Sequence, residues 1–127
     1  MVCELSALFV RFAHESPLDL DVDEDSVRAF IQNRMDNDRC LHIDNKGLLI
    51  YEVMVVPGTR TKITCETYFY VDKPYRGTGI GQELVNRLCE IARDNGSKYV
   101  SIEMSAGIDD FPFGGFKRIG SIYTREI

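Results

Sequence analysis

The sequence is short of the residues that build metal and redox sites. It has only two histidines, and no two of its four cysteines are spaced as a CxxC pair. This pattern argues against zinc and thiol-exchange motifs, and we expect the isolated His14 and His42 to be ordinary surface or half-buried side chains. The thiols are expected to be free rather than joined in disulfides. They are Cys3, Cys40, Cys65 and Cys89.

Long apolar runs and a surplus of positive charge are absent too. No stretch has the roughly 20 apolar residues that cross a membrane, and residues 1–17 lack the basic start of a signal peptide. The net charge of −5 disfavours a nucleic-acid partner, because such binding depends on cations that neutralise phosphates. We therefore expect a cytoplasmic protein with neither a membrane nor a nucleic acid as partner.

What the chain does contain is an ordinary globular composition. With 127 residues, of which 44% are hydrophobic and 28% charged, it suits a single domain spanning residues 1–127. In residues 4–13 the apolar side chains recur at helical spacing, which predicts a first helix. A second helix is predicted around Val27, Phe30 and Ile31, after an acidic run at residues 19–25. That run is explained by a solvated helix start, or alternatively by attraction of a cationic substrate.

Three strands are predicted to follow in antiparallel order. They cover residues 40–43, 48–56 and 63–71, and turn-forming residues separate them at 44–47 and 57–62. A further strand at 99–104 follows a helix, so it should run parallel to the strand at 63–71 through a right-handed crossover. Residues 106–120 suit at most a short helix or turn, and the alternation at 121–127 predicts a closing strand.

The chain is organised around a strand, a glycine turn and a helix. The strand ends at Val71, three glycines follow at Gly77, Gly79 and Gly81, and an apolar helical face then runs to Asn95. Amides at a helix start that glycines leave accessible favour a phosphate or diphosphate. The glycine spacing fits neither the GxGxxG dinucleotide motif nor a Gly-Lys-Ser/Thr phosphate loop. The sequence therefore predicts a binding site for some other phosphorylated ligand.

Residues 71–81 resemble the acetyl-coenzyme A signature of the GCN5-related N-acetyltransferases (GNAT), Arg/Gln-x-x-Gly-x-Gly/Ala. Arg76, Gly79 and Gly81 fill its defining positions, between a β-run and an apolar helix. Residues 115–120 are similar to the late aromatic-x-x-Leu-Gly segment of that family. The resemblance covers residues 4–120 and implies an α/β (α+β) fold, in which helices flank a mixed, mostly antiparallel central sheet. The usual first strand is missing or reduced to residues 1–3.

The resemblance also implies how acetyl-CoA binds, as a cosubstrate and without a metal. Backbone amides of the glycine turn would hold the diphosphate, and backbone groups at the end of the preceding strand would pair with the pantetheine arm. The turn residues are Arg76, Gly77, Thr78, Gly79, Ile80 and Gly81, and the strand residues are Phe69, Tyr70 and Val71.

The reaction implied is N-acetyl transfer to a primary amine of a small molecule or protein. Glu66 matches the region where many members place a carboxylate base, although a bulge in its strand would change the face it occupies. Its alternative role is an exposed strand glutamate. Phe116 stands where many members carry a tyrosine acid, so Tyr123, water or the amine would protonate the thiolate. A catalytically weak or inactive coenzyme A-binding module is the alternative function, and the edge strand at 121–127 suggests a homodimer surface.

Overall fold

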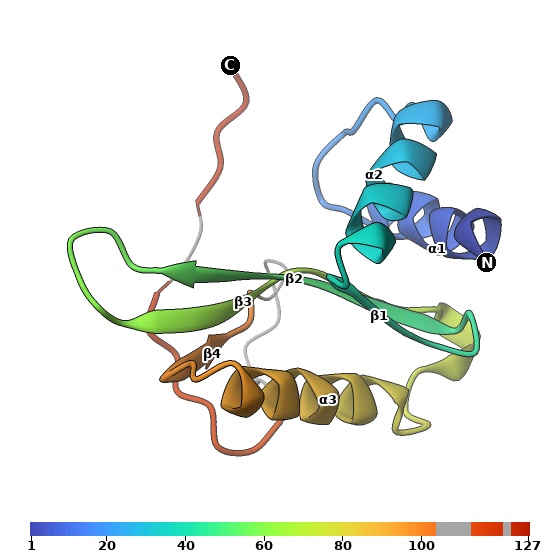
Figure 1. Ribbon diagram of the computed structural model, residues 1–127. Coiled ribbons are helices and arrows are strands. Elements are labelled where there is room, and N and C mark those ends of the chain that lie inside the picture. Colours follow the sequence, from blue (N-terminus) through green and yellow to red (C-terminus); the bar gives the residue numbers. More distant parts are fainter. Residues whose placement is uncertain (104–112, 121–122) are drawn as a thin grey trace.

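The computed structural model describes residues 1–103, 113–120 and 123–127. Two helices are followed by three consecutive strands, a short 3-10 helix, a third helix and a last strand (Figure 1). The elements are α1 (Val2–His14), α2 (Glu24–Asp36), β1 (Cys40–Ile43), β2 (Gly47–Val55), β3 (Lys62–Val71), η1 (Lys73–Tyr75), α3 (Ile80–Asp94) and β4 (Tyr99–Ser101). The helices and strands expected between residues 4 and 95 are thereby confirmed.

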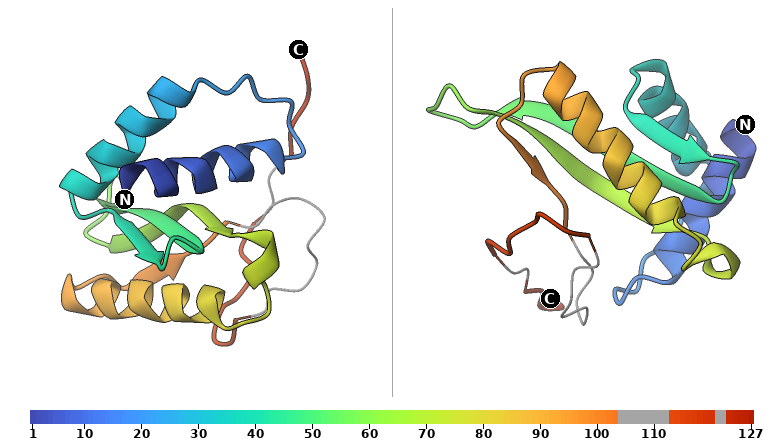
Figure 2. Two further views of the ribbon diagram at one scale, coloured as in Figure 1. Left: turned by 90° about the vertical axis from the view of Figure 1, so that its right-hand side faces the viewer. Right: turned by 90° about the horizontal axis from the view of Figure 1, so that it is seen from below.

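The strands form one mixed sheet in the order β1-β2-β3-β4. β1 pairs antiparallel with β2 and β2 with β3, whereas β4 pairs parallel with β3. The mostly antiparallel sheet and its parallel last strand are both confirmed, because α3 carries the chain across the sheet between β3 and β4. α1 and α2 cover one face of the sheet, and α3 lies on the other (Figures 1 and 2).

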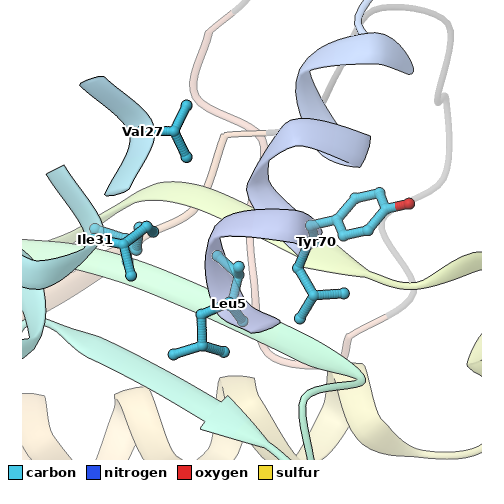
Figure 3. Close-up of a cluster of buried hydrophobic side chains, with 7 residues drawn as sticks. Leu5, Val27, Ile31 and Tyr70 are labelled. Carbon is cyan, nitrogen blue, oxygen red and sulfur yellow. The ribbon is translucent and has the colours of Figure 1, made fainter. Parts of the chain in front are cut away.

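Strand alternation in β2 divides the core into two layers. Leu48 and Ile50 point to α1 and α2, whereas Leu49 and Tyr51 point to α3. The first cluster comprises Leu5, Leu8, Val27, Ile31, Leu48, Ile50 and Tyr70 (Figure 3). The second cluster comprises Leu49, Tyr51, Leu84 and Leu88. Packing from both sides fixes the end of β3 relative to the start of α3.

Both ends of α3 are held in place. A Cβ on Gly47 of β2 would come within 2.7 Å of the Ile80 side chain, so strand and helix meet as closely as a glycine permits. At the other end Gly96 has a φ of 79°, and its N–H donates to the Arg93 carbonyl at 3.2 Å. Gly96 thus ends the helix in the left-handed conformation typical of a glycine cap.

At both ends of the chain the sequence makes a prediction about a strand that the structure can be compared with. α1 begins at Val2, so residues 1–3 form no strand. The closing strand expected at 121–127 is wrong for its described part, because residues 123–127 form no strand. Tyr123 and Ile127 are 92% and 109% exposed, so this described tail has no covered face for an alternating strand to pack against. The homodimer surface expected there has no strand in the described residues.

The segment after β4 is only partly described. β4 ends at Ser101, short of the strand end expected at Met104, which lies outside the described residues. The short helix or turn expected at 106–120 is described only from residue 113, where Gly114 and Gly115 form a turn.

Candidate functional site

The glycine turn leaves backbone amides accessible at the start of α3. Gly77 and Gly79 have φ angles of 80° and 91°, a left-handed region that glycine occupies at no steric cost. A Cβ on either residue would meet open space. The first four N–H groups of an α-helix have no partner inside the helix, and no side chain caps Gly79 at the start of α3. The turn therefore offers donors to an anion, as the sequence predicts.

The side chain of Arg76 is engaged with the end of α1 rather than left for a ligand. Its Nε donates to the Val71 carbonyl at 2.9 Å, and its Nη2 lies 2.9 and 3.1 Å from the two carboxylate oxygens of Glu15. The guanidinium also lies over the Tyr70 ring, 5.4 Å from its centroid. Arg76 thus joins the turn to α1. Its own N–H donates to the Lys73 carbonyl at 3.4 Å, so the amides that remain for a ligand are those that follow Arg76 in the turn.

Tyr70 and Asp72 strengthen the same connection. The Tyr70 hydroxyl donates to Glu15, and Arg11 Nε lies 3.0 Å from the Asp72 carboxylate. Burial and the neighbouring Glu15 raise the pKa of Tyr70 to about 12, whereas hydrogen bonds from Tyr70 and Arg76 lower the pKa of Glu15. At neutral pH Tyr70 is therefore a neutral donor and Glu15 an anion. Sequence analysis missed Glu15, because no local pattern marks a residue that follows a helix and pairs with a distant turn.

In the described residues, one edge of β3 is left unpaired beside the turn. β4 pairs with β3 only at residues 63–65, so residues 66–71 extend past the pairing. Phe69, Tyr70 and Val71 lie on this extension, and η1 joins it to the glycine turn. The contacts of these residues with a coenzyme stay a prediction. The Phe69 ring stacks on Phe113, with centroids 6.0 Å apart and planes at 14°. Phe113 therefore lies beside the end of β3.

A β-bulge determines the direction of Glu66. The register passes from Ile50 opposite Tyr68 to Tyr51 opposite Glu66, so Thr67 is an extra residue on β3. The Thr67 hydroxyl donates to the Ile50 carbonyl at 3.2 Å. Because directly opposed residues share a face of the sheet, Glu66 lies with Tyr51 on the α3 face and not with Tyr68.

Glu66 is buried where β3 and β4 separate. It is 5% exposed, and its carboxylate accepts the Glu103 N–H at 2.9 Å. Burial raises the pKa of Glu66 to about 7, although the hydrogen bond from Glu103 acts in the opposite direction. A carboxyl group with this pKa exchanges protons at neutral pH, as a general base must. The alternative of an exposed strand glutamate is wrong.

Phe116 and Tyr123, the two positions considered for the general acid that protonates the thiolate, lie outside the helices and strands. Phe116, whose ring has no proton to give, helps line a shallow hollow of about 300 Å³ against α3. Tyr123 is 92% exposed in the described tail. Its role as an acid stays a prediction.

Metal and membrane features are not found in the described part of the chain. Across residues 1–103, 113–120 and 123–127, no three His, Cys, Asp or Glu side chains gather where they would hold a metal ion. In the same residues no helix combines the length and apolarity needed to cross a membrane. All four cysteines are free, as expected, and only Cys3 among them is exposed.

Comparison with known proteins adds a family match. The model of the acetyltransferase (GNAT) family matches residues 11–107, a range that contains the whole sheet, the glycine turn, α3 and Glu66. No curated protein matches the sequence.

Several solved structures share the fold at low sequence identity. A GNAT family acetyltransferase from Staphylococcus aureus has a TM-score of 0.71 and 15% identity, covering 99% of this chain and 89% of that one. A protein from Clostridium acetobutylicum, described as a predicted acetyltransferase and solved with acetyl-CoA, has a TM-score of 0.66 and 14% identity over 94% and 89%. A ribosomal-protein-alanine N-acetyltransferase from Brucella melitensis biovar Abortus has a TM-score of 0.61 and 16% identity over 84% and 75%.

Proposed function

Because the chain belongs to the acetyltransferase (GNAT) family, we propose that it transfers an acetyl group from acetyl-CoA to a primary amine of a small molecule or a protein. The observation that carries this proposal is the continuity of the open glycine turn with the edge of β3 that no described residue pairs with beyond Cys65. The amides of the turn suit a diphosphate. The strand edge suits an extended arm that carries amides of its own.

Glu66 is the proposed base of the reaction. The amine nitrogen forms a bond to the thioester carbonyl carbon, the carbon–sulfur bond breaks, and the acetyl group remains on nitrogen. The nitrogen loses its one extra proton to Glu66, directly or through water, while the leaving thiolate takes a proton from Tyr123 or water. In the alternative route the thiolate takes the proton of the amine itself, and Glu66 then accepts none. Burial of Glu66 and its pKa of about 7 support this role.

Two measurements on the purified protein test the proposal. Calorimetry with acetyl-CoA should give saturable binding, and its absence would sink the coenzyme assignment. Release of free coenzyme A should then rise with added amine when small amines, polyamines and peptides are screened as acceptors. The acceptor that gives the highest rate identifies the substrate class.

A coenzyme-binding module without efficient catalysis is the second candidate function. It is favoured by Phe116 at the position where many members carry a tyrosine, and by the exposure of Tyr123. Saturable acetyl-CoA binding without amine-dependent release across the whole panel would support this candidate. A steady amine-dependent rate excludes it.

A further inference from the structure

We propose that Lys46 and Lys73 form a site for a phosphate monoester beside the glycine turn, and that its ligand is the 3′-phosphate of coenzyme A. This inference rests on the proposed function and names a specificity-determining contact for the cosubstrate. Lys46 comes from the β1–β2 hairpin, which is remote in sequence from the residues that resemble the coenzyme signature.

The hairpin is fixed against the end of β3. Asp44 and Asn45 have left-handed φ angles of 48° and 55°, which close the tight turn between β1 and β2. The carbonyl of Lys46 then accepts the N–H of Asp72 at 2.8 Å. The hairpin and the segment that leads into the glycine turn therefore lie side by side at one end of the sheet (Figures 1 and 2).

The ammonium group of Lys46 is held beside the turn. Its Nζ lies 4.9 Å from the centroid of the Tyr75 ring, a cation–π contact. Tyr75 ends η1, and its carbonyl accepts the hydroxyl of Thr78, a residue of the glycine turn. Lys73 begins the same short helix. The Lys46 ammonium thus lies beside the segment that carries the turn amides, and Lys73 precedes those amides in the same segment.

The cations at this end of the sheet fall into two groups. The arginines are paired with carboxylates, whereas the lysines are in no salt bridge within the described residues. The two guanidinium groups are neutralised, Arg11 by Asp72 and Arg76 by Glu15. In the described residues neither Lys46 nor Lys73 is in a salt bridge. Lys73 also lies near enough to Glu15 to lower the pKa of that carboxyl, so its charge is partly compensated by Glu15. The chain as a whole carries a net charge of −5, so a group of cations at this place is a local feature.

The chemistry of coenzyme A explains why such charge is needed here. Its 3′-phosphate and its 5′-diphosphate are attached to the same ribose, so a diphosphate on the turn brings the monoester close by. Lysine binds phosphate as a compact point charge. The site would favour acetyl-CoA over acetyl thioesters that lack the ribose phosphate.

The test compares acetyl-CoA with acetyl-3′-dephospho-CoA by calorimetry. The wild-type protein should bind acetyl-CoA about tenfold more tightly than the dephospho form, and Lys46→Met should reduce that preference about fivefold. Lys46→Arg should retain most of it. Lys98→Met is the matched control, because the Lys98 ammonium also lies over a tyrosine ring, Tyr99 at 5.5 Å, but next to β4 rather than at the glycine turn.

The outcomes separate this inference from the proposed function. Equal binding of both ligands by the wild-type protein, or equal weakening of both by Lys46→Met, overturns the 3′-phosphate site and leaves acetyl transfer in place. No binding of acetyl-CoA at all overturns both. If Lys46→Met does not fold, Lys73→Met provides the same comparison, and an unchanged preference in that variant overturns the site.

Discussion

At the scale of single residues, the Glu66 carboxylate is buried and has few hydrogen-bond donors around it in the described part of the chain. Among the described residues its carboxylate has one recorded donor, the N–H of Glu103. The proton is therefore held more tightly in the folded protein than in water, and the pKa rises from 4.5 to about 7. The folded state gains stability from this proton below pH 4.5, and loses that gain as the pH rises through about 7.

The Glu66→Gln variant should show how much stability the folded protein loses when buried Glu66 ionises, independently of catalysis. Gln is neutral at every pH, so the variant should be more stable than wild type at pH 8.5, by an amount on the order of 3 kcal/mol, and about equally stable at pH 4. Denaturant unfolding at the two pH values measures the difference.

Activity gives the second readout on Glu66. The rate of acetyl transfer by the wild-type protein should rise as the pH passes 7, because only the ionised carboxylate accepts a proton. The Gln variant should still bind acetyl-CoA and lose about 100-fold or more in rate. An unchanged rate in the variant rules out the base role.

Glu15 gives a prediction about the Arg76 brace. Glu15→Gln keeps the side-chain size and removes the charge, so the free energy of unfolding should change by less than about 1 kcal/mol because the pair is partly exposed. Affinity for acetyl-CoA should fall about threefold, since Arg76 no longer fixes the turn. Glu4→Gln, which removes an exposed ion pair at the far end of α1, should leave affinity unchanged. Tighter binding by Glu15→Gln would show instead that Arg76 prefers the diphosphate.

The sequence could locate Glu66 but not its environment. Alternation from Tyr68 and Tyr70 would place Glu66 toward α1 and α2, and the extra residue Thr67 reverses that. Nothing in the local sequence reveals a bulge that depends on the register with β2. Glu15 and Lys46 were out of reach for the same reason, because their contacts join segments distant in the chain.

At the scale of elements, the glycine turn allows a direct test of the phosphate site. Gly79→Leu should abolish detectable binding of acetyl-CoA, because the side chain would stand over the amides. Its positive φ should also cost about 1–2 kcal/mol of stability. Gly58→Leu is the control: Gly58 has a φ of 78°, an equally open surrounding and a place at the other end of β3. We expect both variants to lose a similar amount of stability, but only Gly79→Leu to lose acetyl-CoA binding. If Gly79→Leu still binds acetyl-CoA, the phosphate site at the turn is wrong.

Elements with a strong period and a buried face were predictable. α1 and α3 each show one apolar side in the sequence and bury it in the structure, and β2 is apolar on both faces and packs against both clusters. The alternation at 121–127 carries the same signal, yet Tyr123 and Ile127 are exposed. A strand is stabilised by a partner edge, and a sequence pattern does not show whether that edge exists.

At the scale of the whole molecule, coenzyme binding should stabilise the fold. Acetyl-CoA at a hundredfold excess over its Kd should raise the free energy of unfolding by about 2.7 kcal/mol, which a thermal melt detects as a rise of several degrees. Glu66→Gln should show the same rise, because binding and proton transfer use different groups. No rise in the wild-type protein under saturating ligand argues against binding to the folded state.

The order of the strands in the sheet is also the order in which the ribosome makes them. β1, β2 and β3 pair with their neighbours through short connections, so the meander can assemble from local contacts while later residues are still being synthesised. α3 then supplies the crossover, and β4 adds to an edge that already exists. Biosynthesis therefore completes the binding edge last, and a nascent chain has a packed sheet before it has a site for its cosubstrate.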